Sequence, residues 1–238
     1  AASGAALVSH YALPTTVYGN IGIITPKALT VALTGVASKP YDGLLTVSLS
    51  SSNFALSGVA SGDTLTISQA QGTLASKDVG SNISVKATVA PANFVAGSGT
   101  LLSNYTLPSI ELIGGIGAIS PKTLTASLIG TTSRVYDGSP NATLTSQNFS
   151  LSGLAVGEQL TATQTQGLYV NKNVGTQISV STELSPSNFQ AASGTVVSNY
   201  TLPTAAAGGI GVITPKALTV ALQGAVSRAY DGTTLVSL

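Results

Sequence analysis

The sequence predicts an all-β protein built from tandem antiparallel β-sandwich domains of Ig-like size, each about 95 residues long, in an elongated rod. Three observations favour this fold class. Motifs return every 94 or 95 residues, apolar residues alternate with polar ones, and Ser, Thr, Gly and β-branched residues dominate the composition, as strands and turns require. A β-grasp-like unit is the alternative architecture for each domain.

The repeat is carried by four motifs. Ile-Thr-Pro-Lys-Ala-Leu-Thr at 24–30 returns at 119–125 and 213–219 as close variants, which places Pro26, Pro121 and Pro215 at separations of 95 and 94 residues. A period of this length exceeds one solenoid coil, which takes roughly 20 to 50 residues, and matches a small domain of roughly 100 residues. The predicted organisation is the C-terminal tail of a preceding repeat (1–22), two complete repeats (23–117 and 118–211) and the N-terminal part of a following repeat (212–238).

Within a repeat the apolar period is two, which is typical of strands with one buried and one solvated face. In the first complete repeat, apolar residues occupy alternate positions of 29–33, 65–67 and 83–89. The turn signals predict about seven short strands per repeat. Since tryptophan and cysteine are absent, the core has to use Leu, Val, Ile and a few rings. The expected core rings are Phe54, Phe94 and Tyr105 with their counterparts Phe149, Phe189 and Tyr200.

The repeats are joined by segments in which Ile and Gly alternate, at 17–23, 113–118 and 208–212. A flexible spacer would consist of Gly and Ser without isoleucine. We therefore expect each connection to be short, packed and continued as a strand, so that the rod is semi-rigid.

The composition excludes several classes of function. Only 7 % of the residues are charged and the net charge is +1, whereas soluble domains carry roughly 25 % charged residues. Nucleic-acid binding needs clustered Lys and Arg, and here the nine cations are scattered. The absence of cysteine and the single histidine, His10, exclude a zinc thiolate site and a Cys/His nucleophile. We expect no cofactor, no metal site, no transmembrane segment and no enzymatic activity.

The Tyr-Asp-Gly motif combines an acid with a phenol, but a turn explains it better than a catalytic site. Asp accepts a hydrogen bond from its own backbone in an Asx-turn, Gly supplies a positive φ, and Tyr packs down. The motif comprises Tyr41, Asp42, Gly43, Tyr136, Asp137, Gly138, Tyr230, Asp231 and Gly232.

Covalent Lys-to-Asn isopeptide bonds are a further hypothesis for a fibre without cysteine. The partners that recur in register are Lys27, Lys122 and Lys216, with Asn53, Asn93, Asn148 and Asn188. The intact mass tests this, since each bond releases one ammonia. Calcium, by contrast, prefers several carboxylates, and the eight acids show no Asp-x-Asp pattern.

The motifs ITPKALT, YDG, KNVG and NYTLP, in this order and at this period, resemble the YDG/MBG-type repeats of very large secreted bacterial surface proteins. Such repeats occur in filamentous-haemagglutinin-like adhesins that resemble clients of two-partner secretion. The resemblance covers the whole chain, with mild departures at His10, Lys39-Pro40 and Asp78. It implies a repetitive segment without catalytic residues. A chain that crosses an outer-membrane pore unfolded would also benefit from lacking disulfides and from folding as small local units.

The function expected from these features is structural: a stalk or extracellular filament of a secreted, cell-surface adhesin, involved in cell adhesion or biofilm. The expected partners are neighbouring repeats of the same chain or other copies in a filament. The alternative is a module that binds a host or matrix glycan or another surface. Sugar sites usually display exposed rings, and only Tyr18 and Tyr169 are expected to be exposed, which weakens the alternative.

Overall fold

The computed structural model describes residues 11–12 and 14–235, so His10 lies outside the described residues. The chain forms two compact units. The first comprises the described residues up to Ala37, with Thr46–Leu74 and Ser84–Ile116. The second comprises Ser38–Leu45, Ala75–Ile83 and the described residues from Gly117 onward. Two segments that precede residue 84 in the chain therefore belong to the second compact unit.

Most strands of the first repeat are short, and two long strands form the centre of its main sheet. The strands are β1 Lys27–Ala28, β2 Thr30–Leu33, β3 Ala37–Pro40, β4 Thr46–Ser48, β5 Phe54–Ser57, β6 Leu65–Ile67, β7 Gln71–Leu74, β8 Gly80–Val89, β9 Phe94–Ala96, β10 Tyr105–Thr106 and β11 Ile110–Ser120. Three 3-10 turns, η2 Ser51–Asn53, η3 Pro91–Asn93 and η4 Leu102–Asn104, each lead directly into a strand.

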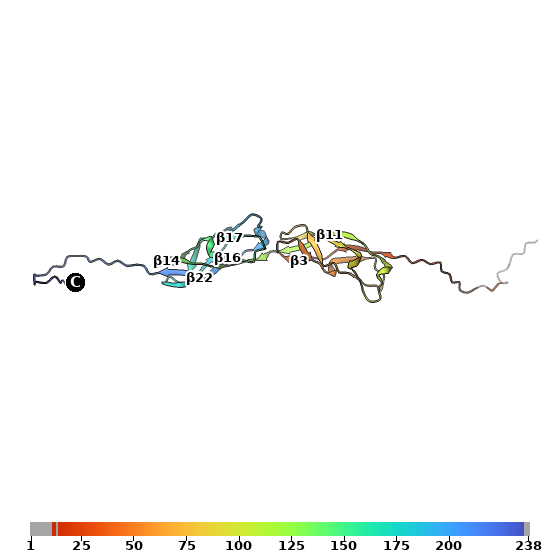
Figure 1. The fold of residues 1–238 in the computed structure, drawn as a ribbon, viewed down its shortest axis with the longest axis horizontal. Coiled ribbons are helices and arrows are strands. Elements are labelled where there is room, and N and C mark those ends of the chain that lie inside the picture. Colours follow the sequence, from red (N-terminus) through yellow and green to blue (C-terminus); the bar gives the residue numbers. More distant parts are fainter. Residues whose placement is uncertain (1–10, 13, 236–238) are drawn as a thin grey trace, which may run out of the picture. The chain divides into compact units, whose positions relative to one another are not determined.

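The second repeat contains the same elements in the same order (Figure 1). Its strands are β12 Lys122–Thr123, β13 Thr125–Leu128, β14 Thr132–Val135, β15 Asn141–Thr143, β16 Phe149–Ser152, β17 Leu160–Ala162, β18 Gln166–Tyr169, β19 Gly175–Glu183, β20 Phe189–Ala191, β21 Tyr200–Thr201 and β22 Ala205–Thr214. Its 3-10 turns are η5 Ser146–Asn148, η6 Pro186–Asn188 and η7 Val197–Asn199.

Sheet order is also the same in both repeats. The five-stranded sheets run β3-β11-β8-β7-β4 and β14-β22-β19-β18-β15, and the remaining strands form two-stranded sheets. The predicted all-β fold with two similar sandwich-like units in tandem is confirmed. Each repeat has more strands than the roughly seven expected from turn signals, because 3-10 turns and two-residue strands divide the segments that read as single strands in the sequence.

Two strand pairs in the second repeat are parallel. β12 pairs with β21, placing Lys122 opposite Tyr200, and β14 pairs with β22, placing Arg134 opposite Ile213. The first of these pairings explains why the Pro-Lys and Asn-Tyr-Thr motifs recur together: they are neighbouring strands. The second carries the chain into the Tyr-Asp-Gly loop, where the Tyr136 N–H donates to the Thr214 carbonyl at 2.8 Å.

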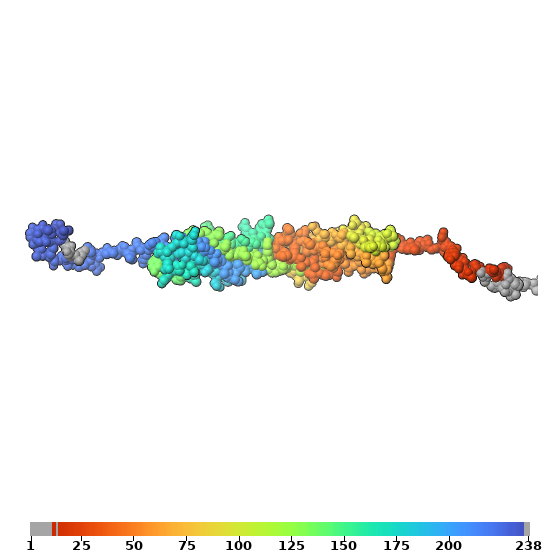
Figure 2. Space-filling model, turned by 90° about the horizontal axis from the view of Figure 1, so that it is seen from below, coloured from red at the N-terminus to blue at the C-terminus, as the bar shows by residue number. Residues whose placement is uncertain are grey.

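The Ile/Gly connections at 113–118 and 208–212 lie within strands β11 and β22. In the space-filling view, β22 (blue) lies beside the cyan part of the chain, as its antiparallel pairing with β19 requires (Figure 2). Residues 17–23 differ from the prediction, because they form no strand and are exposed.

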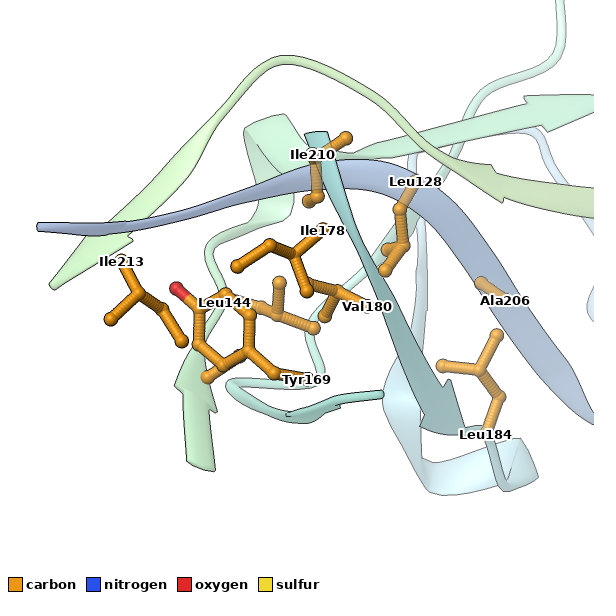
Figure 3. Packing of buried hydrophobic residues seen from close by; sticks show 10 residues of the cluster. Leu128, Leu144, Tyr169, Ile178, Val180, Leu184, Ala206, Ile210 and Ile213 are labelled. Atoms are coloured by element: carbon orange, nitrogen blue, oxygen red, sulfur yellow. The ribbon is translucent and has the colours of Figure 1, made fainter. Parts of the chain in front are cut away.

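The core of the second repeat is a cluster of aliphatic side chains around one tyrosine ring (Figure 3). The cluster consists of Leu128, Ala142, Leu144, Tyr169, Ile178, Val180, Leu184, Ala206, Ile210 and Ile213, with Phe149 and Phe189 packed against it. In the first repeat the expected core rings Phe54, Phe94 and Tyr105 are buried. The alternation predicted from sequence is also observed, since Val85, Ala87 and Val89 are buried along β8.

Tyr169 is a correction to the sequence prediction, which expected its ring to be exposed. Its exposed fraction is 3 %, and its hydroxyl donates to the Thr132 carbonyl at 3.3 Å. Gly211 makes the space: a Cβ atom there would lie 2.5 Å from Cε1 of the ring. The guanidinium carbon of Arg134 lies 5.3 Å from the ring centroid, within the range of a cation–π interaction. The neighbouring glycine that admits the ring lies far away in the sequence, so strand periodicity alone could not reveal it.

Candidate functional site

The three Tyr-Asp-Gly loops share one backbone geometry. The Asp42 carboxylate accepts a hydrogen bond from the Leu44 N–H at 2.9 Å, and Asp137 and Asp231 accept equivalent bonds from the residues two positions ahead, at 2.8 and 3.0 Å. The glycines that follow have φ values of 79°, 81° and 80°, a region that residues with a Cβ rarely adopt. The loop is therefore an Asx-turn with a left-handed glycine in every copy.

A basic residue two positions before each tyrosine pairs with the aspartate of the same loop. Lys39 Nζ lies 2.6 Å from Asp42 Oδ1, Arg134 Nη1 lies 2.7 Å from Asp137 Oδ1, and Arg228 pairs with Asp231. Burial alone would raise the pKa of Asp42, but the hydrogen bonds from Lys39 and Leu44 hold the pKa below its ordinary value. Each loop therefore carries an internal ion pair that supports its turn.

The tyrosines of the three loops differ in their surroundings. Tyr41 is 1 % exposed, whereas Tyr136 and Tyr230 are 37 % and 95 % exposed. Inside the second compact unit, the Tyr41 hydroxyl donates a hydrogen bond to Glu158 Oε1, and its ring meets that of Tyr200 edge-on, with centroids 5.4 Å apart and planes at 82°. This edge-to-face arrangement is a favourable geometry for aromatic pairs. Tyr41 is therefore the residue through which its loop packs against Glu158 and Tyr200.

Glu158 is the centre of the contact. Its Oε2 accepts a hydrogen bond from the Tyr200 hydroxyl at 2.7 Å, and Lys77 Nζ lies 3.6 Å from its Oε1. Burial alone would raise the pKa of Glu158, but the hydrogen bonds from Tyr41 and Tyr200 and the charge of Lys77 keep the pKa below its ordinary value. One ionised carboxylate therefore binds two phenols and an ammonium group.

Asn199 makes the second set of hydrogen bonds that hold the docked segments. Its Oδ1 accepts a hydrogen bond from the Val79 N–H at 2.9 Å, and its Nδ2 donates to Asp78 Oδ1 at 2.9 Å. The residue is only 1 % exposed. Together with Glu158 and Tyr200 it forms what we call the acceptor, which holds the 38–45 and 75–83 segments within the second unit.

The chemistry of the acceptor suits binding. Burial and the Glu158 carboxylate raise the pKa of Tyr41, and burial with the same carboxylate raises that of Tyr200, so both phenols stay protonated donors at neutral pH. Glu158, with its pKa lowered, stays an ionised acceptor. Among the residues that the structure describes, no group of three His, Cys, Asp or Glu side chains could hold a metal ion. The set of groups joins chain segments by hydrogen bonds and one charge pair.

The asparagines named for isopeptide bonds have other partners in the structure. Asn53 Oδ1 accepts from the Ser50 N–H at 3.0 Å and its Nδ2 donates to the Val36 carbonyl at 3.3 Å. Asn148 Oδ1 accepts from the Thr145 N–H at 2.9 Å and its Nδ2 donates to the Ile129 carbonyl at 3.3 Å. Asn93 Oδ1 accepts from the Ala90 N–H and Asn188 Oδ1 from the Ser185 N–H, both at 2.8 Å.

The lysines named with them are placed differently. Lys27 and Lys216 are exposed and Lys122 is half-buried. None of the hydrogen bonds of these asparagines involves one of the three lysines. The structure therefore explains why the asparagines recur: they close turns through their backbone contacts.

A shallow groove of about 540 Å³ on the second unit is a further concave feature of the described residues. It is lined mainly by amide and hydroxyl side chains, among them Asn141, Gln164, Gln166 and Thr182. No aromatic ring is among its lining residues. Of the two rings expected to be available for sugars, Tyr18 is exposed and Tyr169 is buried, so the groove lacks the aromatic platform that the glycan alternative relies on.

Sequence reasoning missed Glu158, Asn199, Lys77 and the basic residue of each loop. A signal for them was present. An acid follows Gly62 and Gly157 in the same register, and Asn precedes Tyr105 and Tyr200. In the sequence these positions served only to define the repeat. A single sequence does not show that residues of one repeat contact a loop of the preceding repeat.

Two further findings concern the chain as a whole. In the part of the chain that the structure describes, no helix has the length and apolar character needed to cross a membrane. The family model described as YDG domain matches residues 25–112 and, a second time, residues 120–207. Comparison with curated proteins and with solved structures finds no match.

Proposed function

The chain belongs to the YDG domain family, with two copies in tandem, and from this premise we propose that it is a non-catalytic structural segment of a secreted bacterial surface adhesin or extracellular filament. In this role the repeats form a stalk, and the working part of each repeat is its contact with the next. The bacterium that produces the chain would export it to the cell surface, where the chain supports cell adhesion or biofilm formation.

The observation that supports this proposal is the insertion of Tyr41 into the acceptor made by Glu158, Tyr200 and Asn199. One copy of a loop that recurs in every repeat is held by residues of the following repeat. This arrangement serves mechanical continuity, because separating the loop from the acceptor would break the hydrogen bond that the Tyr41 phenol donates to the Glu158 carboxylate. A hydrogen bond to a charged group contributes about 1.5–3 kcal/mol.

The composition is compatible with the same role. A surface of Ser, Thr and Ala with 7 % charged residues has few charges that would repel neighbouring fibres. The absence of cysteine suits a chain that is exported unfolded and folds as small local units.

Electron microscopy and sedimentation of the purified 238-residue chain test the proposal. We expect extended particles, and the Asn199→Ala variant should broaden their distribution of shapes because it releases the 75–83 segment. The matched control is Asn104→Ala, at the equivalent exposed position of the first repeat, which should leave the particles unchanged. Compact particles, or specific binding on a glycan array, would contradict the structural role and favour the glycan-binding alternative.

A further inference from the structure

Two tyrosine rings meet beside Glu158 in the second compact unit. The ring of Tyr41 packs edge-on against that of Tyr200, with centroids 5.4 Å apart, and both rings are buried. Their hydroxyls donate to the two oxygens of one carboxylate, Tyr41 to Glu158 Oε1 and Tyr200 to Glu158 Oε2. When phenols are oxidised, they couple through the carbons next to the one that carries the hydroxyl. Because one carboxylate holds both hydroxyls, the reactive edges of the two rings lie at the same end of the pair.

Glu158 supplies this buried pair with its own base. A phenol that loses one electron becomes a strong acid, so the electron leaves readily where a proton acceptor is already bound to the hydroxyl. The Glu158 carboxylate is such an acceptor for both rings, and Lys77 Nζ, 3.6 Å from Oε1, favours its ionised form. The oxidant therefore needs no contact with the rings, because the electron can cross a short distance through the protein while the proton moves to Glu158.

Tyr169 shows that burial alone does not create such a site. This ring is also buried, but its hydroxyl donates to the Thr132 carbonyl at 3.3 Å, and a carbonyl oxygen is a very weak base. The guanidinium carbon of Arg134 lies 5.3 Å from the ring centroid, and a positive charge there opposes the loss of an electron. Tyr169 thus lacks the base, and its ring is held beside a cation.

We propose that Tyr41 and Tyr200 are an oxidative cross-linking site, at which a one-electron oxidant joins the two rings in a dityrosine bond and Glu158 accepts the phenolic protons. This inference rests on the proposed function, since the bond would make permanent the contact that supports it. The chain contains no cysteine, so a disulfide cannot provide this covalent connection. The oxidant belongs to the class of small radical species, or of peroxide activated by a haem peroxidase.

The reaction balances with two electrons and two protons. Each phenol gives one electron to the oxidant and its hydroxyl proton to Glu158, which passes the first proton to solvent before it takes the second. The two radicals then form one carbon–carbon bond between ortho positions. The ortho hydrogens move to the two oxygens, which restores both phenols. Where hydrogen peroxide is the final oxidant, it takes up the two electrons and two protons and becomes two molecules of water.

The cross-link changes what holds the loop. Without it, the 38–45 segment is held by hydrogen bonds and a charge pair centred on Glu158, and these weaken when the carboxylate is protonated. With the bond in place, the loop stays joined to Tyr200 whatever the state of Glu158. A fibre exposed to oxidants would therefore gain resistance to acid and to pulling.

The experiment oxidises the full chain at low micromolar concentration, where collisions between chains are rare, with light, persulfate and tris(bipyridine)ruthenium(II) as the one-electron oxidant. Mass spectrometry after proteolysis identifies joined peptides by the loss of two hydrogen atoms, and dityrosine fluorescence of the monomer gives the yield. We expect the peptide pair with Tyr41 and Tyr200 to be about tenfold or more in excess over pairs with the exposed Tyr18 or Tyr230, because its rings are already oriented.

Three variants test the roles of single groups. Tyr200→Phe keeps the ring but should abolish the cross-link, and the matched control Tyr169→Phe should leave its yield unchanged. Glu158→Gln should lower the yield by about tenfold or more, because an amide cannot take the proton. A Tyr41–Tyr200 product that is no more abundant than the products of the exposed tyrosines would overturn the inference, and an undiminished yield in Glu158→Gln would overturn the role of the carboxylate.

Hydrogen exchange of the Val79 amide separates this inference from the proposed function. This N–H donates to Asn199 Oδ1, so its protection, relative to the Asn199→Ala variant, reports whether the contact forms. Protection in Glu158→Gln shows that a lower yield there reflects the missing base. If the amide is protected in the parent and no cross-link forms, the inference is wrong and the contact stands. If the amide is as unprotected as in Asn199→Ala, the contact that supports the proposed function is itself wrong.

Discussion

The phenol of Tyr41 donates a hydrogen bond to the carboxylate of Glu158, a residue 117 positions further along the chain. The other oxygen of the same carboxylate accepts from Tyr200, so two rings that meet edge-on share one anion. Hydrogen bonds to a charged acceptor are stronger than neutral ones. The Tyr-Asp-Gly motif thus has two roles: its Asp and Gly build a turn, and its Tyr is the part of the loop that contacts another repeat.

Removing the Tyr41 hydroxyl should weaken this contact. Tyr41→Phe keeps the ring and deprives Glu158 of one donor, so we expect the free energy of unfolding to fall by about 2 kcal/mol, the range for a hydrogen bond to a charged group. Urea denaturation monitored by circular dichroism measures it. The control is Tyr136→Phe, whose hydroxyl has no hydrogen bond in the described residues. An equal loss in both variants would contradict the role given to Tyr41.

Asn199 and Asn104 offer a matched comparison at one position of the repeat. Asn199→Ala should destabilise the protein by about 1–3 kcal/mol, because it leaves the Val79 N–H and Asp78 without their partner in a buried place. Asn104→Ala removes an exposed side chain and should change stability by less than about 0.5 kcal/mol. Hydrogen exchange of residues 75–83 measures the local effect: these amides should exchange faster in the first variant alone.

Stability should also depend on pH through Glu158. The pKa of this carboxylate is lowered in the folded chain, so its contribution is present above the ordinary glutamate pKa of about 4.3 and is lost as the pH falls through the folded value. Thermal unfolding followed from pH 7 down to pH 3 measures this loss. Glu158→Gln should reduce the loss of thermal stability between pH 7 and pH 3. A variant with the same acid sensitivity as the parent would show that Glu158 contributes nothing to it.

The alkaline side has the opposite sign. Burial and neighbouring carboxylates raise the pKa of Tyr41 and of Tyr200, so the contribution of the neutral phenols is complete below the ordinary tyrosine pKa of about 10 and is lost as the pH rises toward the folded values. The ultraviolet absorbance of tyrosinate, followed against pH, should show these two rings titrating above the ordinary tyrosine pKa.

Gly211 and Gly209 test the burial of Tyr169. A Cβ at Gly211 would lie 2.5 Å from the ring of Tyr169, whereas at Gly209 the nearest contact is 3.4 Å, to the Gln177 carbonyl. Gly211→Ala should therefore cost about 1–3 kcal/mol through overpacking, and Gly209→Ala should be close to neutral. Calorimetric melting temperatures distinguish the two variants. Similar melting temperatures would mean that the ring can move aside.

The sequence determined much of this protein because many of its structural features are local. The period of 94 or 95 residues and the alternation along 83–89 define the repeats and their strands. The Tyr-Asp-Gly turn is equally local. At Tyr230, where no strand of the described residues accompanies the loop, Asp231 still accepts from the Thr233 N–H and Gly232 still has a φ of 80°. An Asx-turn needs only its own residues.

The tertiary structure alone decided which copies of a motif are buried and what they contact. Tyr41, Tyr136 and Tyr230 are each followed by Asp-Gly, yet their exposed fractions run from 1 % to 95 %. The sequence predicted an exposed ring for Tyr169. In the structure, strand pairing places Gly211 and Arg134 beside this ring, and they enclose it. The physical reason is the same in both cases. Burial of a side chain depends on atoms that lie far away along the chain. The repeat period contains no information about the contacts between one repeat and the next.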